Sequence, residues 1–216
     1  MKSDVYRDLD SLKRDLREGR DYRIRKRKRR SPVLIVAPHG GYIDRGTSAI
    51  VGAIAGKDYS LFDFQGLISE NSFRLHVTSH RFRDAVLTEI LENSRFAVAV
   101  HGMENPENNV DEIWLGGQNR KLKAIVSRCL QAEGFDIDAN PPKYKGEHPA
   151  NVVNLPVEQG VQLELSLSLR AQMFAGSRFF YATGRCPKTT DVFERFIRAV
   201  RAAIKQYEQD DKANAL

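Results

Sequence analysis

The sequence predicts an α/β fold, a single compact domain with a central sheet flanked by helices. Short apolar runs typical of strands buried on both faces alternate with segments that have the period of amphipathic helices. The length of 216 residues suits one domain with its own core. With 41% hydrophobic and 29% charged residues, the composition is that of a folded protein and excludes a wholly disordered chain.

Residues 1–30 are expected to form an N-terminal helix and a basic arm. Apolar residues recur at helical spacing before Gly19, at Val5, Leu9, Leu12 and Leu16. The arm, Arg23 to Arg30, carries seven basic residues in eight positions and accounts for the net charge of +6, because the rest has 27 basic and 28 acidic residues. We favour a solvated linker, and the alternative is contact with a polyanion such as nucleic acid.

The domain proper is expected at residues 31–208, followed by a polar tail at 209–216. It begins with the apolar run Val33 to Ala37, a loop, and a helix from Thr47. Further strands are predicted at Leu61 to Gln65, Leu75 to Thr78, Phe96 to His101, Ile113 to Leu115, Val161 to Leu165 and Phe179 to Ala182. Further helices are predicted at Asp84 to Glu92, Asn119 to Glu133, Ser168 to Phe174 and Thr190 to Gln206. Asp136 to Pro156 is expected to be a long irregular stretch.

The sequence predicts no membrane partner. The N-terminus lacks the apolar segment of a secretory signal, and no run reaches the roughly 18 apolar residues of a membrane helix. Two cysteines are too few for a disulfide framework and suit a reducing compartment. We therefore expect a cytoplasmic protein.

Two histidines end apolar strands and are each followed by glycine. His39 lies in the loop after the first strand, with Asp44 five residues later, and His101 ends the strand at Phe96. In α/β proteins, side chains at such strand ends build sites. Two imidazoles and a carboxylate, with a fourth position open, are a ligand set of catalytic zinc. The alternative is a turn histidine with Asp44 capping the next helix. His76 and His80 are a reserve ligand pair.

Glu164 stands in the middle of a predicted strand. Alternation puts Gln162 and Glu164 on one face and the apolar residues on the other. Two interpretations stand, a solvent-facing edge strand and a partly buried general base beside a metal. Arg170 either supplies positive charge to the same cleft or pairs with a surface carboxylate.

The ordered set APHGG, GTS at residues 46–48, VAVHG, WLGG and GVQLELSLSLR resembles the poly-γ-glutamate hydrolase family, phage-associated relatives of zinc carboxypeptidases. The resemblance implies a compact zinc-carboxypeptidase-like α/β fold with a mixed central sheet, and one zinc ion per chain. His39 and His101 match the family's histidine ligands and Glu164 its catalytic glutamate. Asp44 stands where family members usually carry the longer glutamate.

The resemblance implies a zinc-dependent amidohydrolase that cleaves the γ-glutamyl amide bonds of a polyanionic polymer. Water activated by the metal would attack, Glu164 would act as general base, and Arg170 would stabilise the oxyanion or bind a substrate carboxylate. Release by phage lysis is a further implication. The alternatives are a phage-related replication accessory protein that binds nucleic acid through Arg23 to Arg30, and a catalytically degenerate member, to which the shorter Asp44 points.

Overall fold

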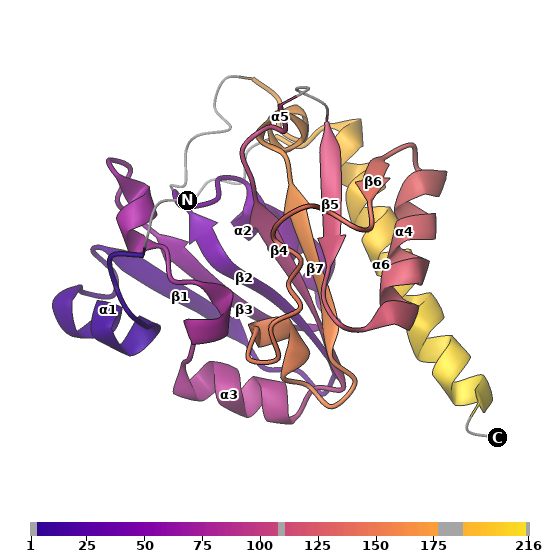
Figure 1. The fold of residues 1–216 in the computed structure, drawn as a ribbon, viewed down its shortest axis with the longest axis horizontal. Coiled ribbons are helices and arrows are strands. Elements are labelled where there is room, and N and C mark those ends of the chain that lie inside the picture. The colour runs from indigo at the N-terminus through magenta and orange to yellow at the C-terminus, as the bar shows by residue number, and fades with distance from the viewer. Residues whose placement is uncertain (1–3, 108–110, 177–187, 215–216) are drawn as a thin grey trace.

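A computed structural model describes residues 4–107, 111–176 and 188–214 of the chain (Figure 1). The strands form one mixed sheet, as the resemblance implied, and seven of them lie in the order β1-β3-β2-β4-β7-β5-β6. β1 and β5 run antiparallel to their neighbours β3 and β7, and the other pairs are parallel. The strands are β1 (Tyr22–Arg27), β2 (Val33–Gly41), β3 (Ser60–Gly66), β4 (Phe96–Gly102), β5 (Glu112–Gly116), β6 (Asp136–Asp138) and β7 (Gly160–Leu165).

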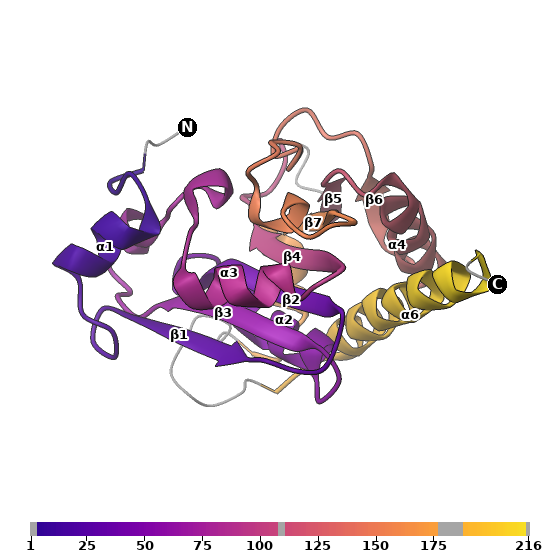
Figure 2. The same cartoon turned by 90° about the horizontal axis from the view of Figure 1, so that it is seen from below.

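Helices cover both faces of this sheet. The α-helices are α1 (Leu9–Asp15), α2 (Thr47–Ala55), α3 (Ala85–Glu92), α4 (Arg120–Ala132), α5 (Leu167–Gln172) and α6 (Asp191–Asn214). One core packs α2, α4 and α6 against the sheet, and a second core packs α1 and α3 against the other face. Figure 2 shows α1 and α6 on opposite sides of the molecule. Among the described residues no helix is both long and apolar enough to cross a bilayer.

Side-chain caps start several helices where the sequence predicts them. The Asp84 carboxylate accepts from the backbone N–H groups of Val86 and Leu87 at the start of α3. Asn119 accepts from Leu122 N–H at the start of α4, and Ser166 caps α5. These caps satisfy backbone donors that the first helical turn leaves free.

The basic segment is not a solvated linker, which corrects the interpretation we favoured. Tyr22–Arg27 is the edge strand β1, and Arg25 lies directly opposite Asp63 of β3. Asp63 is fully buried, and Arg25 forms an ion pair with it at 2.9 Å. A buried carboxylate needs a charge partner, and the basic run supplies it. Leu9, Leu12 and Tyr22 also belong to the second core, so this N-terminal segment packs against the sheet.

Three further expectations differ from the structure or fall outside it. The predicted strand Leu75 to Thr78 is wrong, because Ser72–Leu75 forms a 3₁₀ turn and the next backbone groups bond to side chains. α6 continues to Asn214, into the expected polar tail. The predicted strand Phe179 to Ala182 lies outside the described residues. Asp136 to Pro156 contains only β6 and the short 3₁₀ helix Val152–Asn154 as regular elements, close to the expectation.

We expect Arg25→Ala to lower the free energy of unfolding by about 1–3 kcal/mol. The loss stays below the ~3–5 kcal/mol of a fully buried pair because the Arg25 side chain is 41% exposed. Urea denaturation measures it. Arg23→Ala, on the same strand but exposed, is the control and should change stability by less than ~0.5 kcal/mol. Equal effects of both substitutions would contradict a specific role of the Arg25 and Asp63 pair.

Candidate metal centre and active site

The site lies where β2, β4 and β7 end, on the sheet face that carries the second core. Alanines 97 and 99 of β4 belong to that core, so alternation places His101 on the same face. β4 and β7 pair in parallel with His101 directly opposite Glu164. His39 enters from the end of β2, next to β4 in the sheet. The two histidines and Glu164 therefore meet at one edge, as the sequence predicts.

Two glycines after His39 permit the backbone to turn there. A side chain at Gly40 would place a Cβ 2.3 Å from both Asp63 Oδ1 and Ser48 Oγ. Gly41 has a positive φ of 67°, and a Cβ there would meet the carbonyl oxygen of Gly66 at 2.3 Å. Only glycine fits both positions without displacing β3. This close packing fixes the end of β2 from which His39 projects.

His39, Asp44 and His101 bring three ligand atoms together, all within 4.8 Å of one another. The Nδ1 atoms of His39 and His101 are 3.0 Å apart, and His39 Nδ1 lies 3.5 Å from Asp44 Oδ2. Asp44 Oδ2 also accepts from the N–H of Gly102 at 3.0 Å. α2 starts at Gly46 without a side-chain cap, so Asp44 does not serve as the helix cap that was the alternative.

These atoms fit a metal ion. The Val77 carbonyl can only accept, so His39 Nε2, 2.9 Å away, carries a proton, and Nδ1 is the ring nitrogen left to bind a metal. Burial and the neighbouring His39 lower the pKa of His101 to about 3, which keeps that ring neutral. Ligand atoms on a tetrahedral zinc with bonds of ~2.1 Å lie about 3.4 Å apart. The spacings of 3.0 and 3.5 Å agree with this arrangement.

Glu164 is buried beside these ligands, with 5% of its surface exposed. β7 lies between β4 and β5, so the alternative of a solvent-facing edge strand is wrong. Burial, together with the negative charge of Asp44, raises the pKa of Glu164 to about 8, against the opposing effects of Gln162 and Arg170. For Asp44 burial acts in the same direction, but the hydrogen bond and charge of His39 outweigh it and lower its pKa to about 2. The two carboxyl groups are therefore unlike in proton affinity.

Glu164 is held by a chain of side-chain amides. The sequence analysis identified Glu164 but not this chain. Gln162 Nε2 donates to Glu164 Oε1 at 2.8 Å and to the Tyr144 carbonyl at 3.2 Å. Asn151 Nδ2 in turn donates to Gln162 Oε1 at 3.0 Å. Strand alternation could have pointed to Gln162, because it places Gln162 and Glu164 on the same face of the strand. Asn151 lies in the irregular stretch, and nothing in the local pattern links it to β7.

Arg170 lies at the site, but its guanidinium is occupied by backbone. It donates to the carbonyl oxygens of Leu165 at 3.0 Å, Arg45 at 2.8 Å and Met103 at 2.9 Å. A Cβ at Gly102 would lie 2.4 Å from its Cζ, which explains the glycine after His101. Arg170 therefore joins the segments that follow β2, β4 and β7. These contacts favour a positioning role over the oxyanion role that we expected.

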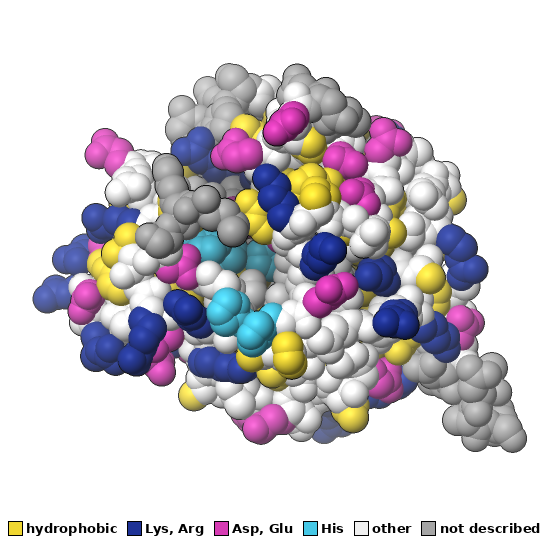
Figure 3. Space-filling view, viewed as in Figure 1, with side chains coloured by type: hydrophobic (Ala, Val, Ile, Leu, Met, Phe, Trp, Pro, Cys, Tyr) yellow, Lys and Arg dark blue, Asp and Glu magenta, His cyan; other side chains and the backbone are white. Residues whose placement is uncertain are grey.

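Each of the five histidines of the chain is in ring contact with another histidine. His39 contacts His76 and His101, and His80 contacts His148. The His76 ring stacks on His39 with centroids 4.0 Å apart, and its Nδ1 contacts Asp4 Oδ1 at 2.6 Å. His80 stacks on His148 at 4.5 Å. Figure 3 shows histidine side chains around a hollow in this face. Among the described residues, the ligand group includes neither His76 nor His80, so the structure gives the reserve pair no support.

Residues 6–199 match the poly-gamma-glutamate hydrolase family. The chain belongs to this family. A structure of a bacteriophage poly-gamma-glutamate hydrolase superimposes with a TM-score of 0.87 at 27% identity, covering 96% of this chain and 99% of that one. YndL of Bacillus subtilis (strain 168) is 29% identical over 90% of this chain and 78% of its own length. A zinc-free structure of YndL has a TM-score of 0.84 at 28% identity, covering 94% and 98%.

A more distant structural neighbour shares only the fold with this poly-gamma-glutamate hydrolase family member. N-formylglutamate amidohydrolase from Ralstonia eutropha JMP134 has a TM-score of 0.53 at 15% identity, over 88% of this chain and 99% of that one. The zinc-carboxypeptidase-like fold class is thereby confirmed. The chain is a member of a hydrolase family.

Arg170→Lys is expected to lower the free energy of unfolding by about 2–3 kcal/mol, measured by thermal or urea denaturation. A lysine keeps the charge, but its single ammonium cannot span three carbonyls in the plane of a guanidinium. Arg45→Lys is the control of the same chemical change, because the Arg45 residue enters this network through its backbone carbonyl. Unchanged stability with lost activity would instead assign Arg170 to substrate or oxyanion binding.

Proposed function

We propose that this protein is a zinc-dependent hydrolase that cleaves the γ-glutamyl amide bonds of poly-γ-glutamate. His39, Asp44 and His101 hold one zinc ion per chain, and Glu164 is the general base. The observation that carries the proposal is the convergence of three ligand atoms within 4.8 Å next to a buried carboxylate. Family membership supports the substrate, and the description of the relative YndL as zinc-free in one structure supports the metal.

Zinc at this site supplies a Lewis acid that lowers the pKa of water and polarises an amide carbonyl. Glu164 takes the proton of the attacking water and delivers it to the leaving amine. Gln162 holds one Glu164 oxygen at 2.8 Å and leaves the other oxygen for this transfer. Val77 fixes the His39 ring through its carbonyl, and Gly102 fixes the Asp44 carboxylate through its N–H.

Arg170 acts by positioning in this proposal. Its three carbonyl contacts join the backbone after His39, after His101 and after Glu164. Catalytic rates depend on ligand and base positions at the scale of ~1 Å, so a bond between these three segments preserves the geometry of the site.

Neither alternative has comparable support. Binding of nucleic acid through Arg23 to Arg30 accounts for the basic edge but uses no residue of the site. That run extends along β1 from Tyr22, opposite Gly66, to Arg27, opposite Leu61, and so leads away from the end of β3 nearest the site. The degenerate alternative rested on the shorter Asp44, yet Asp44 lies 3.5 Å from His39 Nδ1 and belongs to the ligand group.

Elemental analysis and assays on poly-γ-glutamate test the proposal. We expect about one zinc per chain in the wild type, loss of zinc and turnover in His39→Ala, and retained zinc in Glu164→Gln with turnover lowered by about 10²–10⁴-fold. His80→Ala, which alters a histidine outside the ligand group, should retain metal and activity. Absence of zinc after reconstitution, or an active Glu164→Gln, would overturn the assignment.

Gln162→Met is expected to lower kcat by about 10–100-fold with little change in KM, because the base loses the donor that orients it. The Gln162 hydrogen bond lowers the pKa of Glu164. Its removal raises that pKa, so the acidic limb of the kcat profile moves to higher pH. Steady-state kinetics across pH measure both effects. An unchanged limb with an equal loss of kcat would show that the variant acts through packing alone.

A further inference from the structure

A pocket adjoins Glu164 on the β5 side. It is lined by Met103, Glu104, Asn105, Pro106, Trp114, Lys143 and Tyr144. Trp114 is the register partner of Glu164 in the β5 and β7 ladder, and Met103 is two residues beyond His101. Burial, together with the charges of Glu164 and Asp44, raises the pKa of the Tyr144 phenol. The register of Trp114 against Glu164 therefore places the pocket beside the proposed catalytic site.

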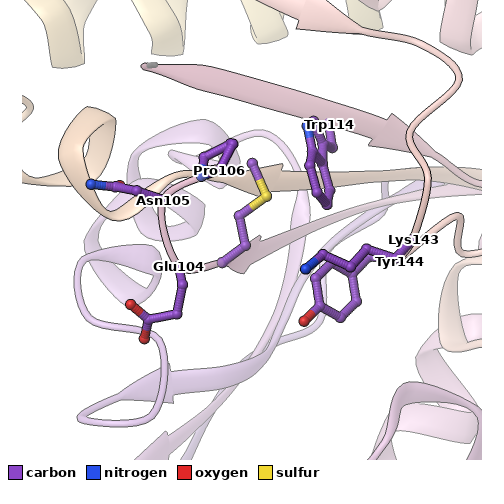
Figure 4. Close-up of a pocket in the computed structure, with 7 residues that line it drawn as sticks. Glu104, Asn105, Pro106, Trp114, Lys143 and Tyr144 are labelled. Atoms are coloured by element: carbon purple, nitrogen blue, oxygen red, sulfur yellow. The ribbon is translucent and has the colours of Figure 1, made fainter. Parts of the chain in front are cut away.

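Two polar side chains of this pocket present unoccupied donors. Lys143 Nζ lies 5.7 Å from the Trp114 ring centroid and 5.5 Å from that of Tyr144. Figure 4 shows the Lys143 ammonium and the Tyr144 hydroxyl pointing into the pocket, with Glu104 on its opposite side. Within the part of the chain that the structure describes, neither the ammonium nor the hydroxyl has an ion pair or hydrogen bond. Together they can bind an anionic oxygen.

The loop that carries these donors is held in place. Tyr144 has a positive φ of 56°, which is costly for a bulky residue and persists only where the surroundings impose it. Its carbonyl accepts from Gln162 Nε2, the same amide group that holds Glu164. The Lys145 carbonyl accepts from Gly117 N–H at 2.8 Å, and a Cβ at Gly116 would lie 2.3 Å from that oxygen. The donors and the base are thus positioned by one network.

We propose that Lys143 and Tyr144 form a subsite for the α-carboxylate of a γ-linked glutamate residue. This inference rests on the proposed function and deepens it. In a γ-linked chain, the carbon attached to the scissile nitrogen carries a free carboxylate, whereas in an α-linked chain the free carboxylate is two carbons further away. A cation in the pocket that adjoins Glu164 therefore distinguishes the two linkages. Glu104, across the pocket, offers an acceptor to an amide N–H, which alternates with carboxylates along the γ-linked polymer.

The single tryptophan of the chain gives a direct measurement of binding, because Trp114 lines this pocket. We would use the zinc-loaded full chain with Glu164→Gln, which prevents turnover, and titrate a γ-linked glutamate oligomer. Trp114 emission reports the pocket, and calorimetry measures the same dissociation constant without the fluorophore. The comparison ligand is the same oligomer with every α-carboxylate converted to a carboxamide.

Adding Lys143→Met should weaken binding of the carboxylate oligomer by about tenfold or more, and Tyr144→Phe by less. Lys143→Arg should retain binding. The matched control is Lys145→Met. It removes the same charge two residues further along the chain, from a side chain that does not line the pocket, and this variant should bind as the parent does. The carboxamide oligomer should bind weakly and equally to all variants. In the otherwise wild-type enzyme, Lys143→Met should raise KM for poly-γ-glutamate more than it lowers kcat.

Equal losses in Lys143→Met and Lys145→Met would overturn the subsite, because they indicate general attraction of a polyanion. Equal affinity for carboxylate and carboxamide oligomers would overturn it as well. Failure of the proposed function has a different signature. If the wild type cleaves no γ-glutamyl bond but Lys143 still governs carboxylate binding at Trp114, the subsite stands and the hydrolase proposal fails.

Discussion

The parallel pairing of β4 with β7 is the constraint on which the site depends. It places His101 directly opposite Glu164 in two central strands, so the proposed ligand and the carboxylate are neighbours without any contribution from a flexible loop. β2 pairs with the other side of β4 and brings His39 to the same edge. Side chains alternate between the two faces of β7. Val161, Leu163 and Leu165 pack into one core, whereas Gln162 and Glu164 face the site.

The buried imidazole nitrogens and carboxyl groups at this edge of the sheet would be stabilised by a bound cation. His39 and His101 present Nδ1 atoms 3.0 Å apart, with the Asp44 carboxylate beside them, and Glu164 adds a second carboxyl group. Besides burial, the charge of Asp44 raises the pKa of Glu164, because like charges this close repel in a medium of low dielectric constant. A divalent ion at the proposed site would offset this repulsion and favour the charged form of Glu164. The same desolvation that is costly for the empty protein therefore favours metal binding.

The sequence was sufficient where the pattern is local. Apolar runs gave the central strands, and the endings of β2 and β4 gave His39 and His101. It failed where the partner is distant in the chain. The basic run looks like a solvated segment by itself, and its role as an edge strand becomes visible only when Arg25 is matched with Asp63. Likewise, no pattern predicts that the Val77 carbonyl fixes His39 or that Asn151 supports Gln162.

Asp44 shows how the fold compensates for a shorter side chain. The resemblance led us to expect glutamate here, and one methylene less reduces the reach of the carboxylate by about 1.5 Å. The turn that carries Asp44 is closed by a hydrogen bond from its own N–H to the His39 carbonyl at 2.7 Å, and Gly102 N–H holds its Oδ2. Both bonds draw the aspartate backbone and carboxylate toward the two histidines. The reach of a carboxylate here is therefore set by the loop as well as by the side chain, so an aspartate at this position is compatible with the proposed metal centre.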